Sequence, residues 1–153
     1  RSAYFAGESK DAINAATELL ANKKLTPELV NEATYYRAKA YLALNEDKAA
    51  IKDLQTLAKD TRTLYGAEAK YLVAQLYFNT GQTALAEKEA LNYIDQSTPH
   101  IYWLARSFVL LSDVYDSLGK KLDAKQYLLS LQQNYTEKDD IQEMINSRLA
   151  KLK

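Results

Sequence analysis

The 153-residue sequence contains no cysteine, which excludes a disulfide framework, a thiolate nucleophile and a cysteine-based zinc site. Its one histidine, His100, is too few for a histidine metal site, and a catalytic triad there would lack partners. No signal peptide and no run of about 18 apolar residues occurs, so no membrane insertion is predicted. Because the sequence begins with Arg1, we expect it to be part of a longer protein, which would carry any targeting signal.

Proline and glycine are also scarce, with two and four residues. The glycines are isolated, so no phosphate-binding glycine loop is present. Alanine, leucine, lysine, glutamate, glutamine and aspartate outnumber the β-branched residues, and no segment alternates steadily between apolar and polar residues. This pattern predicts an all-α protein.

Neither sign of charge dominates, since 20 basic residues balance 20 acidic ones. This balance argues against nucleic acid or an anionic membrane surface as the partner. A hydrophobic fraction of 47% supplies material for a core, and 26% charged residues supply a soluble surface. No cofactor or metal is predicted.

The sequence contains an internal repeat. Four segments have Gly or Asn at the first position and Ala five positions later, and these alanines are spaced 38, 36 and 38 residues apart. Each segment is expected to form a turn in which a left-handed Gly or Asn closes one helix before the next begins. The segments are residues 7–12, 45–50, 81–86 and 119–124.

The repeat predicts a single helical domain over residues 1–153. We expect a half repeat at 7–25, full repeats at about 27–60, 63–96 and 98–135, and a capping helix at about 138–152. The half repeat would hold one helix at 8–22. The expected helix pairs are 28–44 with 47–59, 64–80 with 82–95, and 100–118 with 120–134.

Three short sequences are expected to begin helices. Thr26-Pro27 and Thr98-Pro99 each place a capping hydroxyl before a proline at the first helical position. Asp139-Asp140 is expected to cap the last helix.

The segments 67–81 and 103–119 resemble tetratricopeptide repeats, and the resemblance extends over about residues 7–135. It implies an α-solenoid of antiparallel helix pairs, wound as a right-handed superhelix with a concave groove. The chain is also similar to the C-terminal repeat regions of large bacterial envelope proteins. This narrower resemblance implies a periplasmic or cell-envelope location, with the cytoplasm as the alternative.

The resemblance implies that the first helix of each pair lines the groove. The candidate protein-binding residues are Tyr35, Lys39, Leu42, Tyr71, Gln75, Phe78, Asn79, Arg106, Asp113 and Asp116. In the repeat subclass that binds chaperone tails, a carboxylate clamp uses Lys, Arg and Asn. The clamp positions here hold Tyr35, Lys39, Leu72, Arg106 and Leu110. Two basic residues remain but the asparagines are missing, which argues against capture of such a tail.

Tyrosine is abundant, with 12 residues against three phenylalanines. Tyr41, Tyr77 and Tyr115 recur at one position of the repeat, which favours packing. Tyr35 and Tyr71 are one 36-residue period apart, on the expected groove face.

The favoured function is a scaffold that binds a protein or peptide segment, of unknown identity, in the groove. The alternative is a structural or self-assembly module of a larger envelope complex, in which the open N-terminal half repeat provides the contact. No enzyme is predicted, because no set of nucleophile, base and oxyanion donors converges in the sequence.

Overall fold

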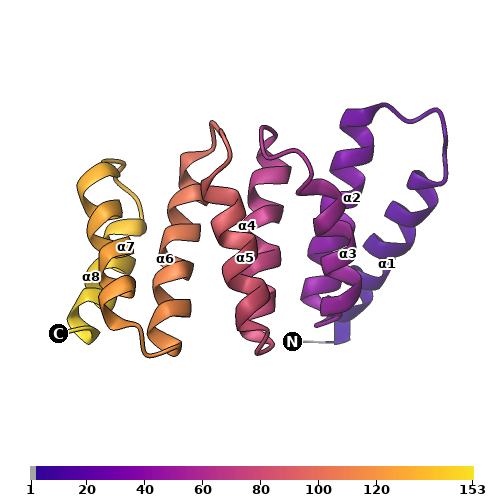
Figure 1. The fold of residues 1–153 in the computed structure, drawn as a ribbon. Coiled ribbons are helices and arrows are strands. Elements are labelled where there is room, and N and C mark those ends of the chain that lie inside the picture. Colours follow the sequence, from indigo (N-terminus) through magenta and orange to yellow (C-terminus); the bar gives the residue numbers. More distant parts are fainter. Residues whose placement is uncertain (1–2) are drawn as a thin grey trace. The chain divides into compact units, whose positions relative to one another are not determined.

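The structure is a computed structural model that describes residues 3–153, with side-chain burial from residue 5 onward. Over that range the chain forms eight α-helices and no strand, which confirms the predicted all-α class (Figure 1). The helices are α1 (Ala3–Leu20), α2 (Pro27–Ala43), α3 (Asp47–Leu57), α4 (Leu64–Asn79), α5 (Thr83–Ile94), α6 (Ile101–Ser117), α7 (Lys121–Asn134) and α8 (Ile141–Lys151).

The chain divides into two compact units whose boundary lies within α4, between Lys70 and Tyr71. In unit 1, α2 packs against both α1 and α3. In unit 2, α6 packs against α5 and α7, and α8 contacts both α6 and α7. Contacts between consecutive helices of this kind fit a helical repeat. No helix within residues 3–153 is long and apolar enough to cross a membrane.

The predicted helix-closing turn recurs three times with the same geometry. Asn45, Gly81 and Gly119 have φ values of 58°, 80° and 76°, in the left-handed region. The residue that follows each of them donates its backbone N–H to the carbonyl five residues earlier, as in a Schellman motif. These bonds are Glu46 to Tyr41 at 2.9 Å, Gln82 to Tyr77 at 2.8 Å and Lys120 to Tyr115 at 2.8 Å.

Each turn is followed by the alanine that defines the repeat. Ala50, Ala86 and Ala124 are fully buried, with 0% exposure. A methyl group at this position lets a neighbouring helix approach closely, so a larger side chain would disturb the packing.

Asn45 is the one residue other than glycine with positive φ in the described chain. A Cβ is disfavoured in this conformation, and asparagine tolerates it better than alanine does. We expect Asn45→Gly to stabilise the protein by about 0.5 kcal/mol and Asn45→Ala to destabilise it by about 1 kcal/mol. Urea unfolding followed by circular dichroism measures both changes. If Asn45→Ala were more stable than Asn45→Gly, this account of the turn would be contradicted.

The turn predicted at Gly7 does not form. Gly7 lies inside α1, which continues from Ala3 to Leu20, and its φ is not positive. A Schellman turn closes a helix that already exists, since its N–H must reach a carbonyl five residues back. Helix α1 runs through Gly7 without a break, so no helix ends at this glycine.

The predicted caps at Thr26 and at Asp139-Asp140 are confirmed, whereas the cap predicted at Thr98 is wrong. Thr26 accepts a hydrogen bond from the Leu29 N–H at 3.3 Å, and Pro27 begins α2. Thr98 accepts instead from the His100 N–H at 3.2 Å, and α6 begins only at Ile101. His100 rather than Thr98 occupies the N-cap position of α6, so the Thr98 hydroxyl forms a turn before the helix and does not cap it.

At the start of α8, one aspartate occupies the N-cap position and the other makes the capping hydrogen bond. Asp140 occupies that position without a side-chain capping bond. Asp139 accepts from the Ile141 N–H at 2.9 Å, and Asp140 accepts from the Tyr102 hydroxyl at 3.0 Å. The second aspartate therefore joins α8 to α6.

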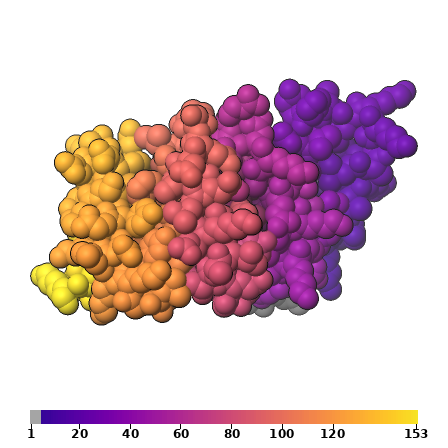
Figure 2. All heavy atoms as spheres, viewed as in Figure 1, coloured from indigo at the N-terminus to yellow at the C-terminus, as the bar shows by residue number. Residues whose placement is uncertain are grey.

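Helix α6 is covered on two sides. Leu110, Leu111 and Val114 belong to a core cluster shared with α4, α5 and α7. Ala105 and Val109 belong to a second cluster shared with α7 and α8. Side chains fill the space that separates the ribbons of α6 and α7 (Figure 2). The polar residues of α6 are consequently held on a rigid element.

Candidate functional site

In unit 1, two candidate residues join one cluster on α2 and α4. The ring of Tyr35 stacks on Tyr65 with centroids 4.4 Å apart, and its hydroxyl donates to Glu68 at 3.0 Å. Lys39 bonds the other oxygen of Glu68 at 3.0 Å. The Tyr35 hydroxyl and the Lys39 ammonium therefore both have the Glu68 carboxylate as a hydrogen-bond partner. The third candidate of this unit, Leu42, is half-buried and makes no polar contact.

In unit 2, a chain of hydrogen bonds runs along α4 through three candidate residues. The Tyr71 hydroxyl donates to Gln75 at 2.8 Å, and the Gln75 amide donates to Asn79 at 2.8 Å. Tyr71 is only 4% exposed and lies in the core. Its ring therefore has no surface to offer a ligand, although the 36-residue spacing relates it to the half-buried Tyr35.

Arg106 is held among aromatic rings rather than carboxylates. Its guanidinium lies 4.8 Å from the ring centroid of Tyr71 and 5.8 Å from those of Tyr102 and Trp103. It donates to the hydroxyls of Tyr71 at 2.9 Å and Tyr102 at 3.0 Å. Among the described residues no carboxylate bonds to it. The guanidinium has five N–H groups, so some remain open to a ligand.

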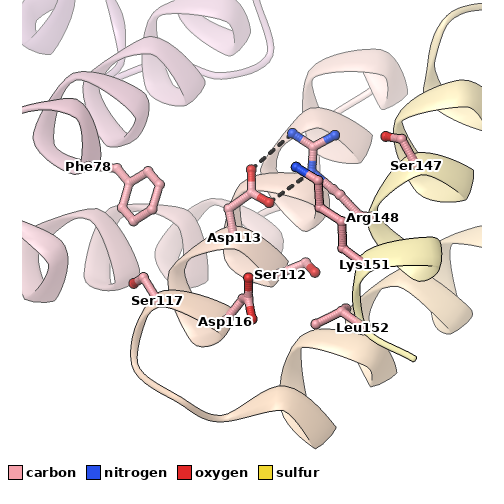
Figure 3. Close-up of a pocket in the computed structure, with 9 residues that line it drawn as sticks. All are labelled: Phe78, Ser112, Asp113, Asp116, Ser117, Ser147, Arg148, Lys151 and Leu152. Carbon is pink, nitrogen blue, oxygen red and sulfur yellow. Dashed lines mark hydrogen bonds and ion pairs between the residues drawn. The ribbon is translucent and has the colours of Figure 1, made fainter.

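The remaining three candidates meet at a hollow of about 390 Å³ (Figure 3). Phe78 lies on one side, α8 lies on the other, and residues of α6 lie between them. The lining residues are Phe78, Ser112, Asp113, Asp116, Ser117, Ser147, Arg148, Lys151 and Leu152. We call this feature the α6–α8 hollow.

An ion pair fixes the wall of the hollow. Arg148 of α8 donates from Nε and Nη2 to the two carboxylate oxygens of Asp113, at 2.8 and 3.0 Å. Two parallel bonds orient both side chains, and each side chain is about one-third exposed. Asp113 is thus paired with Arg148 of α8, whereas Asp116, one turn later, has no partner among the described residues.

Arg148 and Lys151 are site residues that the sequence analysis did not predict. Both are basic residues in the last turn of α8, where a positive charge is favourable at any helix end and does not by itself indicate a site. One signal was available, because Arg148 follows Asp113 by 35 residues, close to one repeat period. An acidic and a basic residue at that separation are candidates for a pair between neighbouring helices.

Tyr135 anchors the segment that leads into α8 and thereby holds this wall. Its hydroxyl donates to Asp139 at 2.6 Å, and it is 7% exposed. Burial and then the hydrogen bond to Asp139 raise the pKa of Tyr135 well above its usual value. A pKa raised by folding contributes stability that is complete below the unfolded pKa of about 10 and is lost as pH rises through the folded value.

We therefore expect Tyr135→Phe to destabilise the protein by about 1 kcal/mol at neutral pH, because the bond to Asp139 is lost. The variant should also lose less stability than wild type as pH rises above about 10. Urea titrations across the alkaline range measure both effects. An unchanged alkaline slope would show that Tyr135 does not contribute to it.

No group of three or more His, Asp or Glu side chains within residues 3–153 is placed to hold a metal ion. The hollow offers two carboxylates, an ammonium, a guanidinium and three hydroxyls beside Phe78 and Leu152. The chain matches no protein-family profile, no curated protein sequence and no solved structure. The site is therefore interpreted from its own chemistry.

Proposed function

We propose that this protein is a tetratricopeptide-type scaffold whose helix pairs form a right-handed α-solenoid. Two observations support this arrangement: the three equivalent Schellman turns and the fully buried alanine that follows each of them. A solenoid of this kind presents rigid surfaces for an extended segment or a helix of another protein. The proposed role is binding and not catalysis.

We propose that the partner binds along the polar face of α6 in unit 2. The α6–α8 hollow carries this proposal, because it brings Phe78, Asp113 and Asp116 together at a concave surface. Arg106 lies two turns before Asp113 on the same helix and retains open N–H donors. A partner segment with polar groups that complement these residues would bind there.

The test is affinity capture from an extract of the source cell, followed by measurement with the purified partner. Wild-type protein should capture a protein that Phe78→Ala/Asp116→Asn binds at least about tenfold more weakly, since the variant loses an aromatic contact and a charge. A matched control, Leu122→Ala/Asp123→Asn, removes an apolar side chain and a carboxylate from α7, where Leu122 is 71% exposed. Equal helicity and melting temperature are first confirmed for all three proteins. Equal affinity of wild type and the hollow variant would overturn the placement.

A second observation favours the alternative of a structural or self-assembly module. Between α1 and α2 lies a mainly apolar hollow of about 230 Å³. Its rim includes Leu19 and Leu29, each 44% exposed, and Tyr36, 56% exposed. Sedimentation of wild type and Leu29→Lys at high concentration tests this alternative. Self-association that the substitution removes would support it, and a monomeric wild type would count against it.

A further inference from the structure

The α6–α8 hollow contains three polar groups that the protein itself does not use. Ser112 is 1% exposed, yet its hydroxyl makes no hydrogen bond with any described residue. The other serines of this region donate to carbonyls three or four residues earlier: Ser107 at 3.0 Å, Ser117 at 2.7 Å and Ser147 at 3.1 Å. Ser112 lines the hollow, so its hydroxyl is placed to bond an occupant of that cavity.

Asp116 is the second such group, an exposed carboxylate that is open to a cation. It lies in the last turn of α6, where the helix dipole is negative and a carboxylate is unfavourable. Asp113, one turn earlier, is neutralised by Arg148. Asp116 has no such partner among the described residues. A bound ammonium group would satisfy both the Asp116 carboxylate and the Ser112 hydroxyl.

Lys151 is the third group and lies on the opposite wall, in the last turn of α8 (Figure 3). Lys151 and Asp116 line the same hollow but do not form an ion pair with each other. The hollow therefore has an open negative group on one wall and an open positive group on the other. Phe78 and Leu152 add apolar surface to the lining.

We propose that the α6–α8 hollow binds a small zwitterion, either a free α-amino acid or a short peptide with free termini. The ammonium group of the ligand bonds Asp116 and Ser112, and its carboxylate bonds Lys151. An apolar side chain of the ligand packs against Phe78 and Leu152. The volume of about 390 Å³ lies in the range of roughly 300–1,000 Å³ that is usual for small-molecule sites. This inference concerns the hollow named in the proposed function and rests on its assignment as the binding site.

Ligands that lack one charge test the proposal directly. Isothermal titration compares leucine and leucyl-leucine with N-acetyl-leucine, which has no ammonium group, and leucinamide, which has no carboxylate. Each blocked ligand is expected to bind at least about tenfold more weakly than leucine, because one charged contact is lost. Tighter binding of leucyl-leucine than of leucine would identify the peptide as the source of the zwitterion. The proposal is overturned if blocked ligands bind as tightly as leucine, or if neither zwitterion binds at millimolar concentration.

Charge-removing variants locate each end of the ligand. Asp116→Asn should weaken leucine binding but leave N-acetyl-leucine unchanged, and Lys151→Met should weaken leucine but leave leucinamide unchanged. The controls Asp123→Asn and Lys125→Met make the same changes on the exposed surface of α7, and they should not change the affinity for any of these ligands. Equal effects of site and control variants would contradict the assignment. Capture of a protein partner that still depends on Phe78 and Asp116, without zwitterion binding, would refute this inference alone.

Discussion

Arg37→Met is expected to destabilise the protein by about 3 kcal/mol, because it leaves a buried carboxylate without its counter-ion. Arg37 of α2 donates from Nε and Nη2 to the two oxygens of Asp53 on α3, at 2.8 and 2.7 Å. The Asp53 side chain is only 8% exposed. Arg37 also donates to Thr17 of α1 at 3.1 Å, so one guanidinium joins three helices. Urea unfolding measures the loss.

Two further variants separate the loss of the pair from the burial of an unpaired charge. The double variant Arg37→Met/Asp53→Leu should recover much of the stability, since it removes the unpaired carboxylate. Lys39→Met is the matched control. Lys39 is 44% exposed, and Glu68 retains the Tyr35 hydroxyl when the lysine is lost, so we expect a change below about 1 kcal/mol. A similar loss for Arg37→Met and Lys39→Met would contradict the argument.

Gly66→Ala is expected to destabilise the protein by about 3 kcal/mol or more, through overlap with backbone atoms that cannot move aside. Gly66 lies in the first turn of α4, buried against the loop that follows α3. A Cβ there would overlap the carbonyl oxygen of Asp60 and lie 2.7 Å from that of Leu57. The Thr63 hydroxyl fixes this approach, accepting from the Gly66 N–H at 2.9 Å and donating to the Asp60 carbonyl at 2.9 Å.

Gly7→Ala is the natural comparison, because a Cβ at Gly7 meets nothing within 4 Å. Gly7 lies within α1, where alanine is a better helix former by roughly 0.5–1 kcal/mol. The two Gly→Ala changes should therefore shift the unfolding midpoint in opposite directions. A stable, normally folded Gly66→Ala protein would show that the loop can move away from α4.

The helix boundaries were largely predictable because local signals determine them. The expected helix at 64–80 is observed at Leu64–Asn79, and that at 120–134 at Lys121–Asn134. A left-handed residue ends a helix through its own backbone conformation, whatever its neighbours are. Gly7 shows where a local signal fails, because the same Gly-to-Ala motif lies inside a continuous helix there.

The site was only partly predictable, because its geometry depends on how helices pack. The resemblance to tetratricopeptide repeats implied Phe78, Asp113 and Asp116 as groove residues, and the structure gathers them at one hollow. The same resemblance implied Tyr71, which Arg106 and Trp103 cover. Arg148 and Lys151 lie on α8, beyond the last repeat. The repeat alignment does not include this helix, and only the 35-residue separation of Asp113 and Arg148 pointed to one of the two residues.

Helix α1 contributes little to the interior of unit 1. Of its residues from Phe5 onward, only Ser9 and Ala16 are buried, each at 7% exposure. Opening α1 alone therefore exposes little new apolar surface, whereas opening α6 would expose eight buried residues. In native-state hydrogen exchange the amides of α1 should consequently exchange through a local opening of low free energy, long before those of α6. The N-terminal helix would then behave as a separate cooperative unit, and a ligand that covered the hollow between α1 and α2 would be detected first as slower exchange in that helix.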